Sequence, residues 1–244
     1  MTKNGFVRGE KLYEGKANTL YATNGPTFIE MEATDRISAG NGEKKDIVSG
    51  KGVVNNTIST MLFKLFEQHG VPTHFVCEGT TKSSKIVRKA CMIKLEVIGR
   101  FIAAGSCCKH YGIEEGTTFD TMTYELTYKD DSLGDPFISE SMAAYGLKVA
   151  TPAVLDVIKK YTYVIGDVAK RFFSEIGITL VDFKVEFGYD AENGMLILCD
   201  EFSPDTCRLW DKDGNSLDKD VFRKDLGHVQ EAYKKILDLV EGGK

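Results

Sequence analysis

The sequence lacks several features that mark large classes of protein. No apolar run reaches the roughly 20 residues that a helix needs to cross a bilayer, so we expect no membrane among its partners. Its first residues, Met-Thr-Lys-Asn-Gly-Phe, contain no apolar segment of the kind that forms a signal peptide. The formal net charge is -5 at pH 7, which argues against a nucleic acid as a partner.

Clusters of metal-binding cysteines are missing as well. The chain has 6 cysteines without a Cys-x-x-Cys pair, and only 4 histidines, so we expect no structural zinc site. Scattered cysteines in a chain of this size are typical of reduced thiols, and they predict a cytoplasmic protein. Cys199 is expected to pack in the core as a small apolar residue.

Strand-like segments outnumber helical ones. We predict two short strands around Gly15 within residues 11–21, and strands near residues 27–32, 73–77, 84–88, 92–98 and 124–129. We predict helices over residues 52–69, 106–111, 152–176 and about 219–240. Thr151 and Pro152 form a typical helix start, as N-cap and first helical residue. This pattern does not alternate regularly between strand and helix, so we predict an α+β fold with mainly antiparallel sheets. We expect a strand-rich N-terminal lobe, residues 1–88, and a C-terminal lobe, residues 89–244.

The most informative segment is a predicted β-hairpin that begins near residue 180. Apolar residues alternate with Asp182, Lys184 and Glu186, so these three should share one face of a strand. Gly194 predicts a three-residue loop, and the resulting register would place Asp200 directly across from Glu186. Carboxylates in such positions repel each other, and a hard divalent cation such as Mg²⁺ would remove that repulsion. A solvated polar face explains the same pattern, and a slip of one residue would separate the two carboxylates.

Two further segments could bind phosphate. Gly15 would let a ligand approach the backbone of a hairpin turn, and Lys16 would add a positive charge, although an ordinary turn also accounts for these residues. Ser106 opens a predicted helix that follows Arg100, and such a helix start binds anions. A simple serine N-cap is the alternative explanation.

Charged residues near the end of the hairpin admit two explanations. Arg208 could bring a guanidinium to the acidic end of the strand, or it could form a salt bridge to Asp205 or Asp211. The acidic loop at residues 129–136 could recognise an amine, or it could simply be solvated.

Together these segments resemble the SAICAR synthetase family over nearly the whole chain. The pair Asp-Phe-Lys-x-Glu-Phe-Gly and Asp-Glu-x-Ser-Pro-Asp is highly specific for this family. The matching segments occur in family order and spacing, at residues 12–17, 38–42, 52–56, 100–106, 135–136, 181–188, 200–211 and 222–223.

The resemblance implies a SAICAR synthase-like fold, ATP-grasp-like and two-lobed, with ATP bound between the lobes. It implies an ATP-dependent ligase of de novo purine biosynthesis. Such an enzyme joins L-aspartate to the carboxylated aminoimidazole ribonucleotide (CAIR) through an acyl phosphate, and releases SAICAR, ADP and phosphate. ATP and Mg²⁺ are the implied cofactors, and the small-molecule substrates and a second copy of the chain, in a homodimer, are the implied partners.

The resemblance also assigns roles to individual residues. The implied catalytic residues are Lys184 and Asp182, and the implied metal ligands are Glu186 and Asp200. The implied substrate contacts are Gly15, Lys16, Ala17 and Lys89 for ATP; Ser38, Asn41, Arg100, Ser106 and Arg208 for CAIR; and Lys129, Asp135 and Arg223 for aspartate.

The chain departs from the family pattern at two positions. Asn18 stands where family members usually have a second lysine, and Asn41 stands where bacterial members often have aspartate. These changes bear on affinity, because neither touches the predicted metal ligands. Two other classes stay open at this stage: a small-molecule kinase or ligase on the same scaffold, and a binding protein without catalysis.

Overall fold

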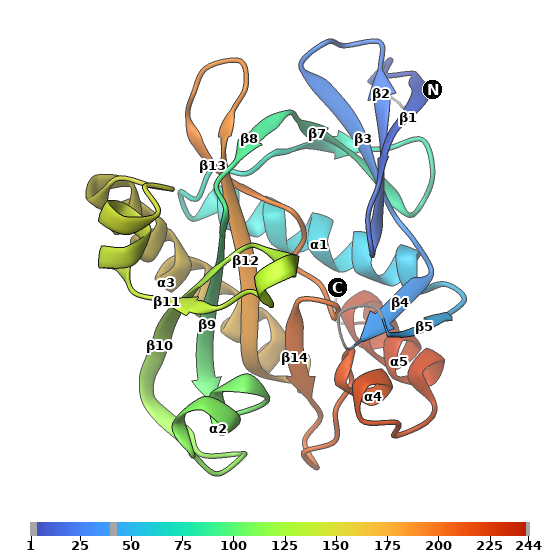
Figure 1. Cartoon of the computed structure of the whole chain (residues 1–244). Coiled ribbons are helices and arrows are strands. Elements are labelled where there is room, and N and C mark those ends of the chain that lie inside the picture. Colours follow the sequence, from blue (N-terminus) through green and yellow to red (C-terminus); the bar gives the residue numbers. More distant parts are fainter. Residues whose placement is uncertain (1–3, 40–42, 243–244) are drawn as a thin grey trace.

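The computed structural model describes residues 4–39 and 43–242. Its first sheet has the order β1-β2-β3-β7-β6, and every neighbouring pair is antiparallel. These strands are β1 Arg8–Glu14, β2 Asn18–Thr23, β3 Phe28–Ala33, β6 Phe75–Glu78 and β7 Ser84–Arg88. Figure 1 shows this sheet curling above the rest of the molecule.

The second sheet is built around one long strand, β12. Its first half pairs with β9 and β14 and its second half with β13 and β8, all antiparallel. The strands of this sheet are β8 Ala90–Met92, β9 Leu95–Ile102, β10 Thr118–Tyr128, β11 Phe137–Ile138, β12 Thr179–Asp190, β13 Leu196–Cys199 and β14 Cys207–Trp210. A separate pair is formed by β4 Arg36–Ala39 and β5 Lys44–Ile47. The predicted α+β fold with mainly antiparallel sheets is therefore confirmed.

Helices cover the sheets and close the core. They are α1 Lys51–Gln68, α2 Ser106–Tyr111, α3 Pro152–Glu175, α4 Asp220–Arg223 and α5 Val229–Gly242, with the single turns η2 Asp131–Leu133 and η3 Met142–Gly146. As predicted, the Thr151 side chain caps α3 by accepting the Val154 N–H. Ile158 and Ile165 of α3 are fully buried in the main core, which fixes α3 against the sheet (Figure 1). Among the described residues, no helix has the length and apolarity needed to cross a membrane.

Two predicted elements are each divided in the structure. The strand predicted at 92–98 is split between β8 and β9, because the Ile93 N–H turns to donate to the Phe187 carbonyl of β12. The final predicted helix is split between α4 and α5. Asp225, Gly227 and His228 all have positive φ between these helices, and no continuous α-helix can accommodate that conformation.

The predicted register of the hairpin is wrong by one residue. Its loop comprises residues 191–194, one residue more than predicted, because the Asp190 N–H donates to the Met195 carbonyl. Gly194 is left-handed as predicted, with φ 71°, and its N–H donates to the Asp190 carbonyl. Glu186 consequently pairs with Cys199, and Asp200 lies one residue beyond the end of β13.

The two sheets use different parts of the chain. Strands of the first sheet lie within residues 8–88, and strands of the second lie within residues 90–210. Helix α1 nevertheless contacts α3 and α5, which follow much later in the chain. The division into lobes of residues 1–88 and 89–244 stays a prediction.

Candidate functional site

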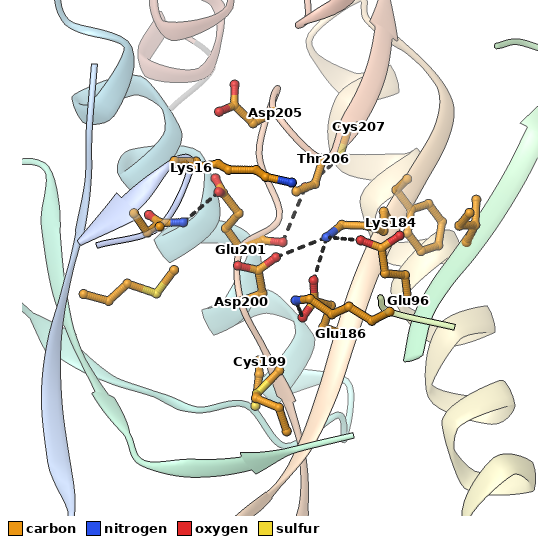
Figure 2. Close-up of a pocket in the computed structure, with 18 of the residues that line it drawn as sticks. Lys16, Glu96, Lys184, Glu186, Cys199, Asp200, Glu201, Asp205, Thr206 and Cys207 are labelled. Carbon is orange, nitrogen blue, oxygen red and sulfur yellow. Dashed lines mark hydrogen bonds and ion pairs between the residues drawn. The ribbon is translucent and has the colours of Figure 1, made fainter. Parts of the chain in front are cut away.

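A cleft of about 690 Å³ is lined by residues of both sheets. One part of its wall is apolar and comes from β2, β3 and β7, where Leu20, Ile29, Met31 and Val87 lie. Another part is strongly charged and comes mainly from β9, β12 and the segment after β13 (Figure 2). The cleft can therefore take a ligand that is flat and apolar at one end and anionic at the other.

Lys184 lies at the centre of the charged part. Its ammonium donates to Glu186 at 2.7 Å and to Glu96 at 3.1 Å, and it lies 3.5 Å from Asp200 (Figure 2). Lys184 and Glu186 share a face of β12 because they are two residues apart. Asp200 reaches the same point from the other arm of the hairpin with a left-handed backbone, φ 59°. The predicted grouping of Lys184, Glu186 and Asp200 is therefore present despite the changed register.

The position of Glu186 and Asp200 is compatible with their predicted role as ligands of a magnesium ion. Glu186 and Asp200 both contact the Lys184 ammonium, so their carboxylates lie close enough together to share a cation beside it. The described residues contain no cluster of three or more potential metal ligands. Two carboxylates nevertheless suffice for Mg²⁺, which usually keeps several waters and takes further oxygens from substrate phosphates.

The charges of this centre shift each other's pKa values. Burial opposes the charge on Lys184, but Glu186, Asp200 and Glu96 outweigh it and raise the Lys184 pKa well above its ordinary value. Burial and the neighbouring Glu186 carboxylate raise the pKa of Asp200. Lys184 is thus a permanent positive charge at neutral pH and not a proton acceptor.

Arg100 and Arg208 converge on Asp182 at another part of the cleft. Both guanidiniums donate to the same Asp182 oxygen, Oδ2, and the Arg208 bond is 2.7 Å long. Arg100 also donates to the Ser106 hydroxyl at 3.1 Å, at the start of α2. The three residues predicted to bind the CAIR phosphate therefore come together, although Arg208 is far from the other two in the sequence.

A second carboxylate fixes Arg208 from the other side. Asp220 accepts the Arg208 Nε–H at 2.9 Å and also accepts a bond from Arg223. Burial opposes the charge, but Asp182 and Asp220 raise the pKa of Arg208 above its ordinary value. The alternative pairing of Arg208 with Asp205 or Asp211 is wrong, since Asp182 and Asp220 are its ion-pair partners.

The remaining predicted residues divide into two groups. Gly15, Lys16, Ala17, Lys129, Asp135 and Arg223 all line the cleft. Lys16 forms an ion pair with Asp131 of the acidic loop at 2.7 Å, and Lys129 contacts Glu186. Lys89 does not line the cleft; its ammonium donates to the Pro26 carbonyl. Ser38 lies in β4 and does not line it either, and Asn41 lies outside the described residues.

Some charged residues of the cleft were not predicted from the sequence. Glu96 could have been found, because it alternates with Arg100 along β9 and must share its face. Asp205 also lines the cleft, where it accepts bonds from buried Lys51 at 2.7 Å and from the Tyr233 hydroxyl at 2.6 Å. No local pattern relates these residues, since Lys51 and Tyr233 lie on helices at opposite ends of the chain.

The fold and the cleft together define the class: an α+β protein whose cleft is lined by two sheets and combines an apolar wall, an acidic centre and a pair of arginines. The model of the SAICAR synthetase family matches residues 11–240, and the chain belongs to this family.

Individual relatives agree with this assignment. The chain is 47% identical to the phosphoribosylaminoimidazole-succinocarboxamide synthase of Finegoldia magna, across 96% of this chain and 100% of that protein. A SAICAR synthetase (Type-2) in complex with ADP superposes with a TM-score of 0.90 at 40% identity, covering 96% of this chain and 98% of that one. The corresponding synthase from Ehrlichia chaffeensis also gives a TM-score of 0.90, at 39% identity, with 95% and 98% covered.

Proposed function

We propose that this protein is a phosphoribosylaminoimidazole-succinocarboxamide synthase, an ATP-dependent ligase that joins CAIR and L-aspartate to give SAICAR, ADP and phosphate. The observation that carries the proposal is the meeting, in one cleft, of the paired arginines Arg100 and Arg208 with the Lys184 centre. The two arginines would bind a phosphate, and the Lys184 centre would stabilise the charge that develops during acyl activation. The family to which the chain belongs carries out this ligation.

ATP is proposed to bind along the apolar wall. A purine base fits against the side chains of β2, β3 and β7, and the phosphates then extend toward the turn of residues 15–17. The ion pair of Lys16 with Asp131 is exposed and therefore weak, so a phosphate can replace Asp131 as the partner of Lys16. The related synthetase bound to ADP supports a nucleotide in this cleft. Lys89 is the weakest of the predicted ATP contacts because it points to Pro26 instead.

CAIR is proposed to place its 5′-phosphate against Ser106, Arg100 and Arg208. Guanidiniums hold phosphate through paired, charge-assisted hydrogen bonds, and Asp182 keeps both of them oriented before the substrate arrives. The contacts of Asp182 favour this orienting role over direct participation in the chemistry. Ser38 and Asn41 remain predicted CAIR contacts.

The reaction needs a CAIR carboxylate oxygen to attack the terminal phosphate of ATP, forming an acyl phosphate and releasing ADP. The amine of aspartate then attacks the acyl carbon, and phosphate leaves. Lys184 is proposed to stabilise the negative charge in both steps, since its ammonium stays protonated. Glu186 and Asp200 would hold Mg²⁺, which neutralises charge on the transferred phosphoryl group when it is bound. Lys129, Asp135 and Arg223 are the proposed contacts of aspartate.

The test is an ADP-release assay with CAIR and Mg²⁺, performed with and without L-aspartate, in parallel with detection of SAICAR. We expect sustained ADP release only when all substrates are present, with one SAICAR formed for each ADP. Equal ADP release without aspartate, and no SAICAR, would favour a small-molecule kinase. Nucleotide binding without Mg²⁺ dependence or turnover would favour a binding protein.

A homodimer and a cytoplasmic location are proposed from the family resemblance and from the scattered free cysteines. Sedimentation of the purified protein at micromolar concentration tests the first, and fractionation of cells tests the second.

A further inference from the structure

Lys85 is a buried cation that the proposed mechanism does not use. It lies on β7 with 3% of its surface exposed, and its ammonium donates to the Ser59 hydroxyl at 2.6 Å. The ammonium also lies 4.9 Å from the centre of the Phe63 ring. Among residues 4–39 and 43–242, no carboxylate forms an ion pair with it. An ammonium is costly to bury without a compensating charge, so its position requires an explanation.

Glu201 is a buried carboxylate, of charge opposite to that of Lys85. It is 5% exposed and lines the cleft, and its carboxylate accepts hydrogen bonds from neutral groups. Asn18 donates to one oxygen at 2.9 Å, and Ser203 donates to the other at 2.5 Å. Asn55 adds a longer contact of 3.5 Å. Within the part of the chain that the structure describes, Glu201 has no cation at ion-pair distance.

Ser59 connects the two charges. Its hydroxyl oxygen accepts the bond from Lys85 and also the N–H of Phe202, which follows Glu201 in the chain. Ser59 therefore links Lys85, which lies in the interior, to Phe202, the residue next to Glu201 at the cleft. Burial lowers the pKa of Lys85 to about 8, and Glu201 and Asp200 act against that shift. The ammonium is thus still mostly charged at neutral pH and interacts with both carboxylates through a medium that screens poorly.

The location of Glu201 matters because the phosphates of a nucleotide are anionic. Lys16 and Glu201 both line the cleft, and Asn18, two residues after Lys16, donates to Glu201 (Figure 2). A buried carboxylate without a balancing cation would repel a polyphosphate at that position. Asn18, the residue of β2 that faces Glu201 from the cleft side, contributes no charge.

We propose that Lys85 is a positioning residue of the nucleotide site: its ammonium balances the Glu201 carboxylate from the interior, so that the cleft accepts the phosphates of a nucleotide beside Glu201. The inference rests on the proposed nucleotide site. Lys85 does not touch the ligand and acts through Glu201 and the Ser59–Phe202 segment.

The experiment is a double-mutant cycle with Lys85→Met, Asn18→Lys and the double variant, in which MgADP is titrated by calorimetry. We expect Lys85→Met to weaken MgADP binding about tenfold, the scale of coupling within one charged network. The KM for ATP should rise with a smaller change in kcat. Asn18→Lys places an ammonium on Glu201 from the cleft side, so it should restore most of the affinity in the Lys85→Met background. In the wild-type background it should improve the affinity by a smaller factor, because Lys85 already balances Glu201.

Two results would overturn the role of Lys85. One is unchanged MgADP affinity in a folded Lys85→Met variant, and the other is an equal effect of Asn18→Lys in both backgrounds. If Lys85→Met does not fold, the double variant Lys85→Met/Glu201→Gln, which removes both charges, decides the question: MgADP affinity near that of wild type supports the balance, and a loss of about tenfold contradicts it. Failure of the wild type to bind MgADP would instead contradict the proposed nucleotide site.

Discussion

Lys184 and Glu186 stand two residues apart on β12, and the Lys184 ammonium donates to Glu186 at 2.7 Å. This contact fixes the position of a carboxylate that is almost fully buried, and Asp200 meets the same ammonium from the other arm of the hairpin. A carboxylate held in this way would lose little additional conformational entropy on binding a metal. The arrangement therefore supports the proposed Mg²⁺ site with two protein ligands.

Changing Glu186 to Gln tests the proposed metal site. The substitution keeps the shape of the side chain but removes a charge that Mg²⁺ requires, so we expect Mg²⁺-dependent turnover to fall at least about 100-fold. Glu192→Gln is the matched control, because Glu192 lies at the exposed tip of the same hairpin and outside the cleft. Circular dichroism checks that Glu186→Gln folds, and initial rates measure its turnover. Near-normal turnover in the folded variant would contradict the proposal that Glu186 binds the metal.

Lys16 and Lys11 provide a matched pair in the first hairpin. Both side chains are 55% exposed and both form one surface ion pair, but only Lys16 lines the cleft. We expect Lys16→Ala to raise the KM for ATP by about tenfold, with a smaller effect on the KM for aspartate, because it removes a charge-assisted phosphate contact worth about 1.5 kcal/mol or more. Lys11→Ala should leave both constants nearly unchanged. Equal increases for ATP and aspartate in Lys16→Ala would show that the lysine has a structural role.

The pKa of Lys85 makes a prediction about stability at high pH. Burial lowers its folded-state pKa to about 8, below the ordinary value of 10.5. Between these values the unfolded chain binds more protons than the folded protein, so the contribution of Lys85 to stability rises as the pH rises from 8 toward 10.5. We expect the free energy of unfolding of wild type, relative to Lys85→Met, to improve by up to roughly 3 kcal/mol over that range. Urea unfolding of both proteins at several pH values measures the difference, and a constant difference would contradict the depressed pKa.

Strand and helix segments with strong patterns were predictable from the sequence. The helix that starts at Pro152 lies where its cap and apolar stripe placed it, and β7 and α2 have the predicted bounds. The register of the central hairpin was not predictable, because it depends on one backbone hydrogen bond from Asp190 to Met195. The break between α4 and α5 depends on positive φ at Asp225, Gly227 and His228, and two of these residues are not glycine.

The charged centre was predictable only in part. Alternation along β12 was sufficient to group Asp182, Lys184 and Glu186 on one face. The alternation could not predict which residues these three side chains contact. Lys184 and Glu186 face Asp200, whereas Asp182 faces Arg100 and Arg208. Contacts such as Lys85 with Ser59 depend on how a helix packs against a sheet, and a local pattern contains no information on such packing.

Gly105 makes a final prediction about the paired arginines. It precedes α2 with φ 60° and ψ -123°, a conformation that side chains disfavour, and a Cβ there would lie 2.2 Å from Nη2 of Arg208. Gly105→Ala should therefore displace the Arg208 guanidinium from the anion site. We expect CAIR affinity to fall by about 10- to 100-fold, as it should in Arg208→Ala, because one charge-assisted contact contributes about 1.5–3 kcal/mol.

Gly112→Ala is the control for this effect. Gly112 ends the same helix with a left-handed backbone, φ 67°, and an added Cβ would contact nothing within 4 Å. Both alanine variants should lose stability of about 1 kcal/mol or more from backbone strain, but only Gly105→Ala should lose CAIR affinity. Titration of CAIR and of its dephosphorylated nucleoside separates the two roles. Wild type and Gly112→Ala should prefer the nucleotide strongly, whereas Gly105→Ala and Arg208→Ala should lose most of that preference. A full preference in Gly105→Ala would show that Arg208 is not needed at this position to read the phosphate.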